Sequence, residues 1–350
     1  MAKEPVAVTI DRVTRIYKNV KGRKDVVAVD EASFVVNPGE LVTLLGPSGC
    51  GKTTTLRMIA GFDLPTRGAI RIGGEDVSAL PPNKRDTATV FQSYGLFPHM
   101  SVAENVAYGL RLRKVPKAEM DERVKRALAL TGLADYAERS PGRLSGGQQQ
   151  RVALSRSLVV EPGVLLLDEP LSNLDALLRE QMRVEIRRIQ KSLGITAVYV
   201  THDRVEAMSL SDRVIVMKDG RIRQIGSPNA IYEKPDSVFV AGFVGKVAFF
   251  PVDVQGVDGD SCACSLRGKT VKAGSRATDI AAGKPAVLMA RPESLRLGPP
   301  ESGVVDGTVR QNLYLGSTLA IGRAHVCTSV RNKQMLCRLL VEKKHDIDKP

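Results

Sequence analysis

The sequence contains no tryptophan, few aromatic residues and few cysteines. Aromatic residues make up 4% of the 350 positions, and there are 5 cysteines. An odd count, and no histidine or further cysteine beside Cys262 and Cys264, argue against a disulfide framework and a zinc site, so we expect free thiols. No apolar run approaches the ~20 residues that cross a bilayer, and the opening residues, MAKEPVAVTIDRV, lack an apolar signal region. We therefore expect a location in the cytosol.

Acidic residues are too few to balance the basic ones. The sequence has 51 Lys and Arg against 38 Asp and Glu, a net charge of +13. Such an excess is compatible with a nucleic acid or an anionic membrane surface. We favour a solvated basic surface that also binds nucleotide phosphate, and we expect no nucleic-acid partner, because charge alone identifies none. The length favours two domains of ~100–200 residues each.

Residues 41–55, LVTLLGPSGCGKTTT, carry the most specific signal in the chain. The apolar run Leu41–Leu45 predicts a buried strand, residues 46–53 fit G-x-x-x-x-G-K-[ST], and apolar residues at helical spacing follow. Glycines let backbone N–H groups approach phosphate oxygens, and a helix N-terminus adds positive charge. We expect Lys52 to reach the β- and γ-phosphates and the Thr53 hydroxyl to bind Mg²⁺. The alternative is a chance glycine-rich turn, which the flanking pattern argues against.

Two further apolar runs end in residues suited to catalysis. Residues 164–167 lead into Asp168 and Glu169, and residues 195–200 lead to His202. We predict that Asp168 holds Mg²⁺ and that Glu169 orients or deprotonates the attacking water. His202 stands where open α/β sheets bind ligands, at the carboxyl end of a strand. The alternatives are solvated carboxylates in a turn and a structural histidine.

The segment Ser145-Gly-Gly-Gln148 is predicted to open a helix and to form a second anion-binding turn. Its alternative is a plain helix cap. Residues 6–36 alternate as antiparallel strands, residues 101–138 and 176–193 are helical in spacing, and Asp219-Gly220 marks a hairpin. After about residue 235 the helical patterns stop, and short strands between glycine-rich turns predict a small β-barrel-like domain.

The complete set of motifs resembles the ATP-binding subunit of an ABC transporter over residues 6 to about 245. The set consists, in chain order, of Tyr17, GPSGCGKT at 46–53, Gln92, LSGGQ at 144–148, LLLDE at 165–169, SNLD at 172–175 and His202. The resemblance implies a P-loop NTPase, with a RecA-like core, an antiparallel β-layer and a helical subdomain at about 93–160. It places the nucleotide-binding domain at 1–240 and an accessory β domain at 241–320.

The same resemblance implies a role for each motif residue, with ATP and Mg²⁺ as cofactors. In the family, two copies pair head to tail, the nucleotide lies between them, and two membrane permease subunits and a solute-binding protein complete an importer at the cytoplasmic face of the inner membrane. We expect a helix of the permease to dock near Ser93–Met100. The implied residues are Glu169, His202 and Gln92 for catalysis; Tyr17, Gly46, Ser48, Gly49, Cys50, Gly51, Lys52, Thr53 and Thr54 for nucleotide binding, with Tyr17 stacking on adenine; Ser145, Gly146, Gly147 and Gln148 for contact with the other copy's nucleotide; Ser172 and Asp175 for coupling; and Thr53, Gln92 and Asp168 for the metal.

Within that family, RPESLRL is similar to the import ATPases for polyamines, ferric iron, sulfate, phosphonates and sugars, and TLLGPSGCGKTTTLRMIAGF and VFQSYGLFPHMSV look nearest to the polyamine and ferric-iron members. We favour a polyamine as cargo, with ferric iron, phosphonate, sulfate or sugar as alternatives. An ATPase of DNA repair would need a long coiled coil between the phosphate loop and LSGGQ, and the interval here shows no sustained heptads. A translation-type member would need two nucleotide-binding heads.

The last residues depart from the family pattern. After VDGTVRQNLYLGSTLA, the stretch that begins IGRAHV lacks the expected strand-and-turn spacing. We predict that residues 321–350 are a non-native tail and that the accessory domain is incomplete.

Overall fold

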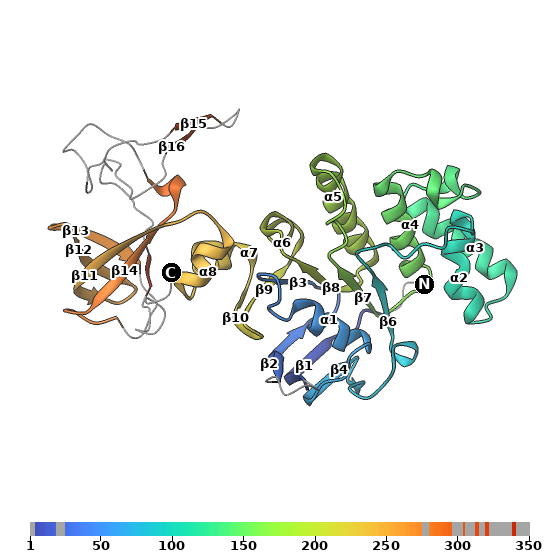
Figure 1. Ribbon diagram of the computed structural model, residues 1–350, viewed down its shortest axis with the longest axis horizontal. Helices are drawn as coiled ribbons and strands as arrows, with labels where there is room; N and C mark the ends of the chain where they lie inside the picture. Colours follow the sequence, from blue (N-terminus) through green and yellow to red (C-terminus); the bar gives the residue numbers. More distant parts are fainter. Residues whose placement is uncertain are drawn as a thin grey trace. The chain divides into compact units, whose positions relative to one another are not determined.

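The structure is a computed structural model. It describes residues 4–18, 25–274, 280–295, 304, 312–314, 319–321 and 338–340. The chain divides into two compact units, Met1–Pro228 and Asn229–Pro350 (Figure 1). The predicted α/β class with a second, β-barrel-like part is confirmed. The domain limits that we set at residues 240 and 320 stay predictions.

A six-stranded sheet in the order β10-β9-β3-β8-β7-β6 forms the centre of the first unit. Its strands are β3 (Leu41–Leu45), β6 (Thr87–Val90), β7 (Val164–Asp168), β8 (Thr196–Thr201), β9 (Arg213–Lys218) and β10 (Arg221–Gly226). All neighbours pair in parallel except β9 and β10, the predicted hairpin, where Asp219 and Gly220 have φ of 53° and 76°. Because β3, β7 and β8 run in parallel, the residues that follow them meet at one edge of the sheet.

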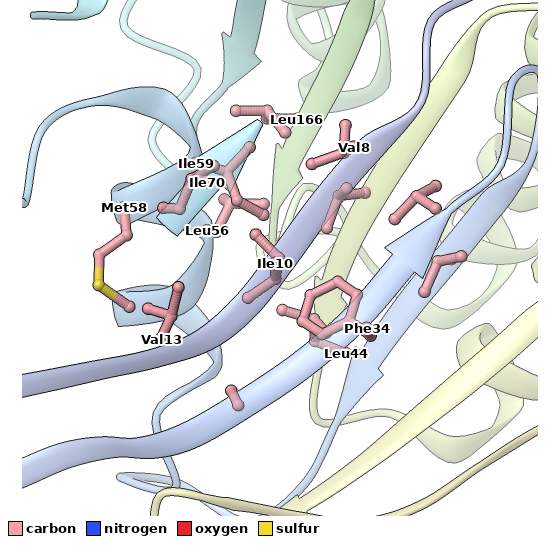
Figure 2. Packing of buried hydrophobic residues seen from close by; sticks show 14 of the residues in the cluster. Val8, Ile10, Val13, Phe34, Leu44, Leu56, Met58, Ile59, Ile70 and Leu166 are labelled. Atoms are coloured by element: carbon pink, nitrogen blue, oxygen red, sulfur yellow. The ribbon is translucent and has the colours of Figure 1, made fainter. Parts of the chain in front are cut away.

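A second sheet, antiparallel and in the order β2-β1-β4-β5, confirms the predicted β-layer. Its strands are β1 (Val8–Tyr17), β2 (Val26–Val36), β4 (Arg67–Ile72) and β5 (Glu75–Asp76). Side chains from β1 and β4 pack with Leu44 of β3, Leu166 of β7 and the apolar face of α1 (Lys52–Ala60) in one buried cluster (Figure 2). The phosphate-loop helix is therefore held between the two sheets by apolar packing.

The helical subdomain consists of α2 (Val102–Leu112), α3 (Lys117–Leu130) and α4 (Gly146–Leu158), with short 3₁₀ turns at Ala134–Tyr136 and Pro141–Arg143. The three helices lie side by side (Figure 1), and a buried apolar cluster of their own holds them together. Ser101 and Glu104 form the predicted capping box of α2. Outside this subdomain, helix α5 (Ala176–Leu193) follows β7 and helix α6 (Arg204–Leu210) follows β8. A further 3₁₀ turn spans Pro82–Lys84.

The second unit contains a closed barrel in the order β11-β12-β13-β17-β14. The strands are β11 (Ala248–Asp258), β12 (Ser261–Leu266), β13 (Lys269–Gly274), β14 (Pro285–Ala290) and β17 (Arg338–Leu340), with a 3₁₀ turn at Pro292–Ser294 and the small pair β15 (Asn312–Tyr314) and β16 (Leu319–Ile321). Two helices, α7 (Pro228–Glu233) and α8 (Val238–Val244), precede the barrel. Our expectation that helices stop near residue 235 is wrong for α8.

The predicted non-native tail falls mostly outside the described residues. Of positions 321–350, the structure describes Ile321 and the strand Arg338–Leu340, which pairs with β14 and at one point with β13. Whether the tail is native therefore stays a prediction. Within the described residues, the search for a helix long and apolar enough to cross a bilayer finds none.

Candidate functional site

The phosphate loop connects β3 directly to α1. Gly51, the N-cap of α1, has φ of 99°, and no side chain caps the helix. A Cβ at Gly51 would lie 2.4 Å from the carbonyl oxygen of Ala28, and one at Gly46 would lie 2.4 Å from that of Met217. Both glycines are thus required by a close backbone approach and not only by flexibility. With no side-chain cap, the N–H groups of the first turn are available to an anion.

Lys52 is buried at the base of this loop. Its Nζ donates to the carbonyl oxygens of Gly46, at 2.8 Å, and of Pro47, at 3.0 Å, and lies 3.8 Å from the sulfur of Cys50. The ammonium group is therefore already inside the loop, where it would meet a bound phosphate. Contact with the β- and γ-phosphates stays a prediction.

Thr53 and Asp168, both predicted to bind Mg²⁺, come together from α1 and β7. The Thr53 hydroxyl donates to Oδ1 of Asp168 across 3.2 Å. Burial raises the pKa of Asp168, the Thr53 hydrogen bond opposes this, and the nearby negative charge of Glu169 adds to it. A hydroxyl and a carboxylate are oxygen ligands of the kind Mg²⁺ prefers, and Mg²⁺ is commonly held by one or two carboxylates together with substrate phosphates. The residues present fit a phosphate-bound Mg²⁺. Within the described part of the chain, this site included, no group of three or more His, Cys, Asp or Glu is arranged to hold a metal without a substrate phosphate.

Glu169 and His202 form the next pair along the same edge. Nδ1 of His202 lies 3.2 Å from Oε2 of Glu169. Glu169 has φ of 43°, an unusual value for a side chain of this kind, and its N–H donates to the carbonyl of Val200. Strained backbone at a strand end is often found at functional sites. A small cavity of about 50 Å³ is lined by this pair together with Arg179 and Asp203.

Comparison with known proteins identifies the family. A family model described as ABC transporter matches residues 29–172. The chain is 53% identical over 289 residues to the Fe(3+) ions import ATP-binding protein FbpC 1 of Rhizobium meliloti (strain 1021), an alignment that covers 83% of this chain and 81% of the relative. The chain belongs to the ABC transporter family. It is an ABC ATPase.

Two more relatives show how far the similarity extends. The ABC ATPase is 48% identical over 319 residues to the spermidine/putrescine import ATP-binding protein PotA of Thermobifida fusca (strain YX), covering 89% of this chain and 82% of the relative. It also matches a dimeric structure of the ATP-binding cassette MJ0796 in a post-hydrolysis state with ADP and Pi, at TM-score 0.56 and 31% identity, over 63% of this chain and 98% of that one. The P-loop NTPase fold and the nearest groups named from the sequence are confirmed.

The Ser145 turn of this ABC ATPase is a capped helix start. The Ser145 N–H donates to Oε1 of Gln148 at 2.9 Å, and Ser145 Oγ accepts from the Gln148 N–H at 3.4 Å. Gly147 is buried, while Ser145 and Gly146 are exposed. Within one copy, the turn is therefore a plain helix cap, as the alternative states. The predicted contact with another copy's nucleotide would involve the exposed residues of the turn, and it stays a prediction.

The coupling and metal candidates Gln92, Ser172 and Asp175 lie on loops around the same edge. The backbone carbonyl of Gln92 accepts from Asn173 Nδ2 at 3.0 Å, so the two loops are joined. Ser172 Oγ donates to the Glu169 carbonyl at 2.9 Å, and Asp175 caps α5 by accepting from the Leu178 N–H. Ser172 therefore supports the backbone of Glu169, whereas the predicted metal contact of the Gln92 side chain stays a prediction.

The predicted docking segment, Ser93–Met100, is a loop as expected, but its apolar residues do not all face outward. Tyr94 is 8% exposed and packs in a core cluster beside β7. Arg156 of α4 donates to the carbonyls of Tyr94 and Gly95 at 2.8 and 2.7 Å, and its burial lowers its pKa. The loop is thereby tied to the helix that carries the Ser145 turn.

Glu206 is a functional candidate that sequence reasoning missed. It is 3% exposed, and it accepts from the hydroxyls of Tyr199 at 2.9 Å and Thr201 at 2.7 Å. Burial raises its pKa. Glu206 holds the end of β8 immediately before His202, so it positions the strand that presents the histidine. Its only sequence signal is its place in the first turn of α6, three residues after the N-cap Asp203.

Proposed function

We propose that this ABC ATPase is the energy-supplying subunit of an importer, working as a pair of copies on two separate membrane subunits. The observation that carries the proposal is the arrangement at one sheet edge, where Thr53–Asp168 and Glu169–His202 stand beside the phosphate loop. A phosphate-binding loop, an oxygen site for a metal and a paired carboxylate are the parts that phosphoryl transfer to water requires.

The residues divide the work as follows. The backbone N–H groups after Gly51 and the Lys52 ammonium bind the β- and γ-phosphates. Thr53 and Asp168, with Gln92, hold Mg²⁺, which would neutralise charge on the phosphate oxygens. Glu169 accepts a proton from the attacking water or orients it. His202, held by Glu169, contacts the γ-phosphate. Tyr17 stacks on the adenine through its ring face.

A second copy completes the pocket. The exposed Ser145 hydroxyl and the N-terminus of α4 supply hydrogen bonds to the γ-phosphate held on the other copy's loop. The related cassette of known structure is dimeric, which supports the pairing of two copies. Differential contact with ATP favours the closed pair, and loss of the γ-phosphate lets it open. Asp175 and Ser172 lie near that interface, the Ser93–Met100 loop receives the membrane subunit, and a solute-binding protein delivers the cargo.

The cargo is a small solute, and two kinds are supported. The relatives named for Fe(3+) ions are 53% and 50% identical and the relative named for spermidine/putrescine is 48% identical, so a polyamine is not favoured over ferric iron on similarity. Both are cations. The choice between them belongs to the binding protein and the membrane subunits, whose sequences are separate.

Uptake by a strain that lacks the gene tests the proposal. Complementation with the wild type is expected to restore accumulation of either labelled ferric iron or labelled spermidine, and Glu169→Gln is expected to abolish it while the protein still binds ATP. Glu180→Gln, at an exposed position on α5, is the matched control and is expected to restore uptake. Wild-type uptake with Glu169→Gln would refute the proposed role, and restoration of neither cargo would refute the assignment to these two solutes.

The paired state has its own test. With ATP and Mg²⁺, purified Glu169→Gln is expected to elute as a dimer in size-exclusion chromatography and to return to a monomer with ADP. Elution only as a monomer with ATP would contradict the shared pocket.

A further inference from the structure

The aromatic ring of Tyr17 is fixed by two neighbours that no motif contains. The Arg15 guanidinium carbon lies 4.6 Å from the Tyr17 ring centroid, and the Tyr17 hydroxyl donates to Oδ2 of Asp63 at 3.1 Å. Tyr17 itself stays 37% exposed. One ring face is therefore covered by a cation, the hydroxyl end is anchored, and a large part of the ring still reaches solvent.

Arg15 is itself held in place under the ring. Its Nη1 donates to the Leu64 carbonyl at 2.8 Å, and its Nη2 meets Oδ1 of Asp63 at 3.3 Å. Within the described residues, its buried Nε has no hydrogen-bond partner. An unpaired buried donor is costly and calls for an explanation. Arg15 nevertheless places its guanidinium against the Tyr17 ring, a cation–π contact that accompanies the unpaired Nε.

Asp63 connects this ring to the phosphate-loop helix. Its Oδ2 also meets Arg57 Nε at 3.1 Å, and Arg57 lies in the last turn of α1. The N–H groups of Phe62 and Asp63 donate to the Arg57 carbonyl, which ends the helix. A single carboxylate, 14% exposed in its side chain, thus contacts Arg15, Tyr17 and Arg57. The ring and α1 are joined through it.

We propose that Arg15 and Asp63 are positioning residues that hold the Tyr17 ring as a platform for the base of a bound nucleoside triphosphate, at a fixed place relative to the phosphate loop. The inference rests on the proposed function, in which Tyr17 stacks on the adenine. A ring that is already immobilised loses less freedom when a base stacks on it, so preorganisation raises affinity for the base and not for the phosphates. Stacking tolerates any base, so guanine nucleotides share the effect.

The test compares ligands that have a base with one that lacks it. Dissociation constants of the full-length protein are measured for ATP, GTP and inorganic tripolyphosphate, together with KM and kcat for ATP. Arg15→Ala and Asp63→Asn are expected to weaken ATP and GTP binding about 5-fold to 10-fold, with Kd for tripolyphosphate changed less than about twofold. KM is expected to rise far more than kcat falls. Arg15→Lys, which keeps a cation near the ring, is expected to recover part of the loss.

Two further variants and a control separate the outcomes. Tyr17→Phe keeps the ring but loses the Asp63 bond, and is expected to weaken ATP binding about twofold to threefold, less than Tyr17→Ala. Arg71→Ala, at a partly exposed arginine on β4 that pairs with Asp11, is expected to leave every constant unchanged. If Tyr17→Ala does not weaken ATP binding, Tyr17 is not the base platform, and that part of the proposed function fails. If Tyr17→Ala weakens it but Arg15→Ala, Asp63→Asn and Tyr17→Phe do not, the positioning inference alone is overturned. Equal losses for ATP and tripolyphosphate would overturn it too, since they would indicate general damage to the phosphate loop.

Discussion

Two glycine-rich segments of the first unit each lead into a helix, and they differ in whether a side chain caps the first turn of that helix. The phosphate loop ends at Gly51, which has φ of 99° and brings no capping side chain. The Ser145 turn opens α4 with a reciprocal capping box between Ser145 and Gln148. The first helix therefore offers its N–H groups to a ligand, and the second satisfies part of its own and exposes a hydroxyl.

The glycines of the two segments also differ in how tightly they are enclosed. A Cβ on Gly51 would meet the backbone of Ala28, which cannot move alone, whereas one on Gly146 would come within 3.3 Å of Leu174 Cδ2, the end of a flexible side chain. The phosphate loop is thus fixed by the rest of its own chain. In the Ser145 turn, a Cβ on Gly147 would come within 2.6 Å of Leu178 Cδ1, so the glycines of that turn are enclosed by side chains, whereas Gly51 is enclosed by backbone.

The largest effect is expected from Gly51→Ala. Alanine at this φ costs about 1–2 kcal/mol, and the overlap with the Ala28 carbonyl adds about 1–3 kcal/mol. A total near 3 kcal/mol lowers Tm by about 8 °C in a unit of this size, and ATP binding is expected to be lost. The matched change Gly146→Ala is expected to shift Tm by no more than about 3 °C, because alanine is the better helix former. Thermal unfolding of both variants measures the difference, and equal shifts would contradict the contrast in enclosure.

The next effect separates binding within one copy from binding between copies. Lys52→Ala removes an ammonium aimed into the loop and is expected to weaken ATP binding to the monomer about 10-fold to 100-fold. Ser145→Ala is expected to change that affinity less than about twofold but to reduce ATP hydrolysis at least about 10-fold, since one contact to the transferred phosphate disappears. Titration with a fluorescent ATP analogue at low protein concentration, and ATPase assays at high concentration, measure the two quantities. Weakened monomer binding in Ser145→Ala would place that turn in its own copy's pocket.

The residues that sequence reasoning found are those whose role is carried by local spacing. The span of α5 was predicted from a helical apolar face, and the structure starts it at the N-cap Asp175 and ends it at Gly194, whose φ is 61°. Strand β3 agrees with its predicted range for the same reason, since a buried parallel strand is an uninterrupted apolar run.

What the sequence does not reveal are contacts between positions far apart along the chain. Arg15 and Asp63 are separated by 48 positions, and neither belongs to a motif. Helix α8 was missed because its sequence, VFVAGFV, is apolar on all sides and only seven residues long, so it has no helical stripe. Ala241 of α8 is buried together with Met289 of β14, so tertiary packing, and not an amphipathic stripe, stabilises this helix.

A moderate effect is expected from alkylation of Cys50. The thiol is 3% exposed, and its burial raises its pKa above the ordinary value of 9.0, although Lys52 opposes the shift. Because the thiolate is the reactive form, labelling of the folded protein is expected to be slow at pH 7 and to accelerate about tenfold per pH unit up to the thiol pKa. Once attached, the adduct fills the loop and blocks ATP binding. Mass spectrometry of the labelled fraction against residual ATP binding measures both, and fully labelled protein with normal ATP binding would contradict the placement of Cys50. Cys262, buried in the barrel, is the internal control, because its labelling is expected to leave ATP binding unchanged.

The smallest effect tests whether the nucleotide-free phosphate site lowers the free energy of unfolding, which the self-capped Ser145 turn is not expected to do. Burial raises the pKa of Asp168, so the folded protein holds the charged carboxylate less favourably than the unfolded chain does. The stability associated with protonated Asp168 is therefore complete below the unfolded pKa of about 3.9 and is lost as pH rises through the folded pKa.

Asp168→Asn, which is neutral at every pH, is expected to raise Tm without nucleotide by about 1–2 °C at pH 7 and to show no gain at pH 3.5. The same variant is expected to abolish the added stability that ATP and Mg²⁺ provide. Asp175→Asn is the control, since that exposed carboxylate caps α5 and asparagine caps a helix equally well. A lower Tm for Asp168→Asn at pH 7 would mean that the Thr53 hydrogen bond outweighs burial, and the phosphate site would then be as self-sufficient as the Ser145 turn.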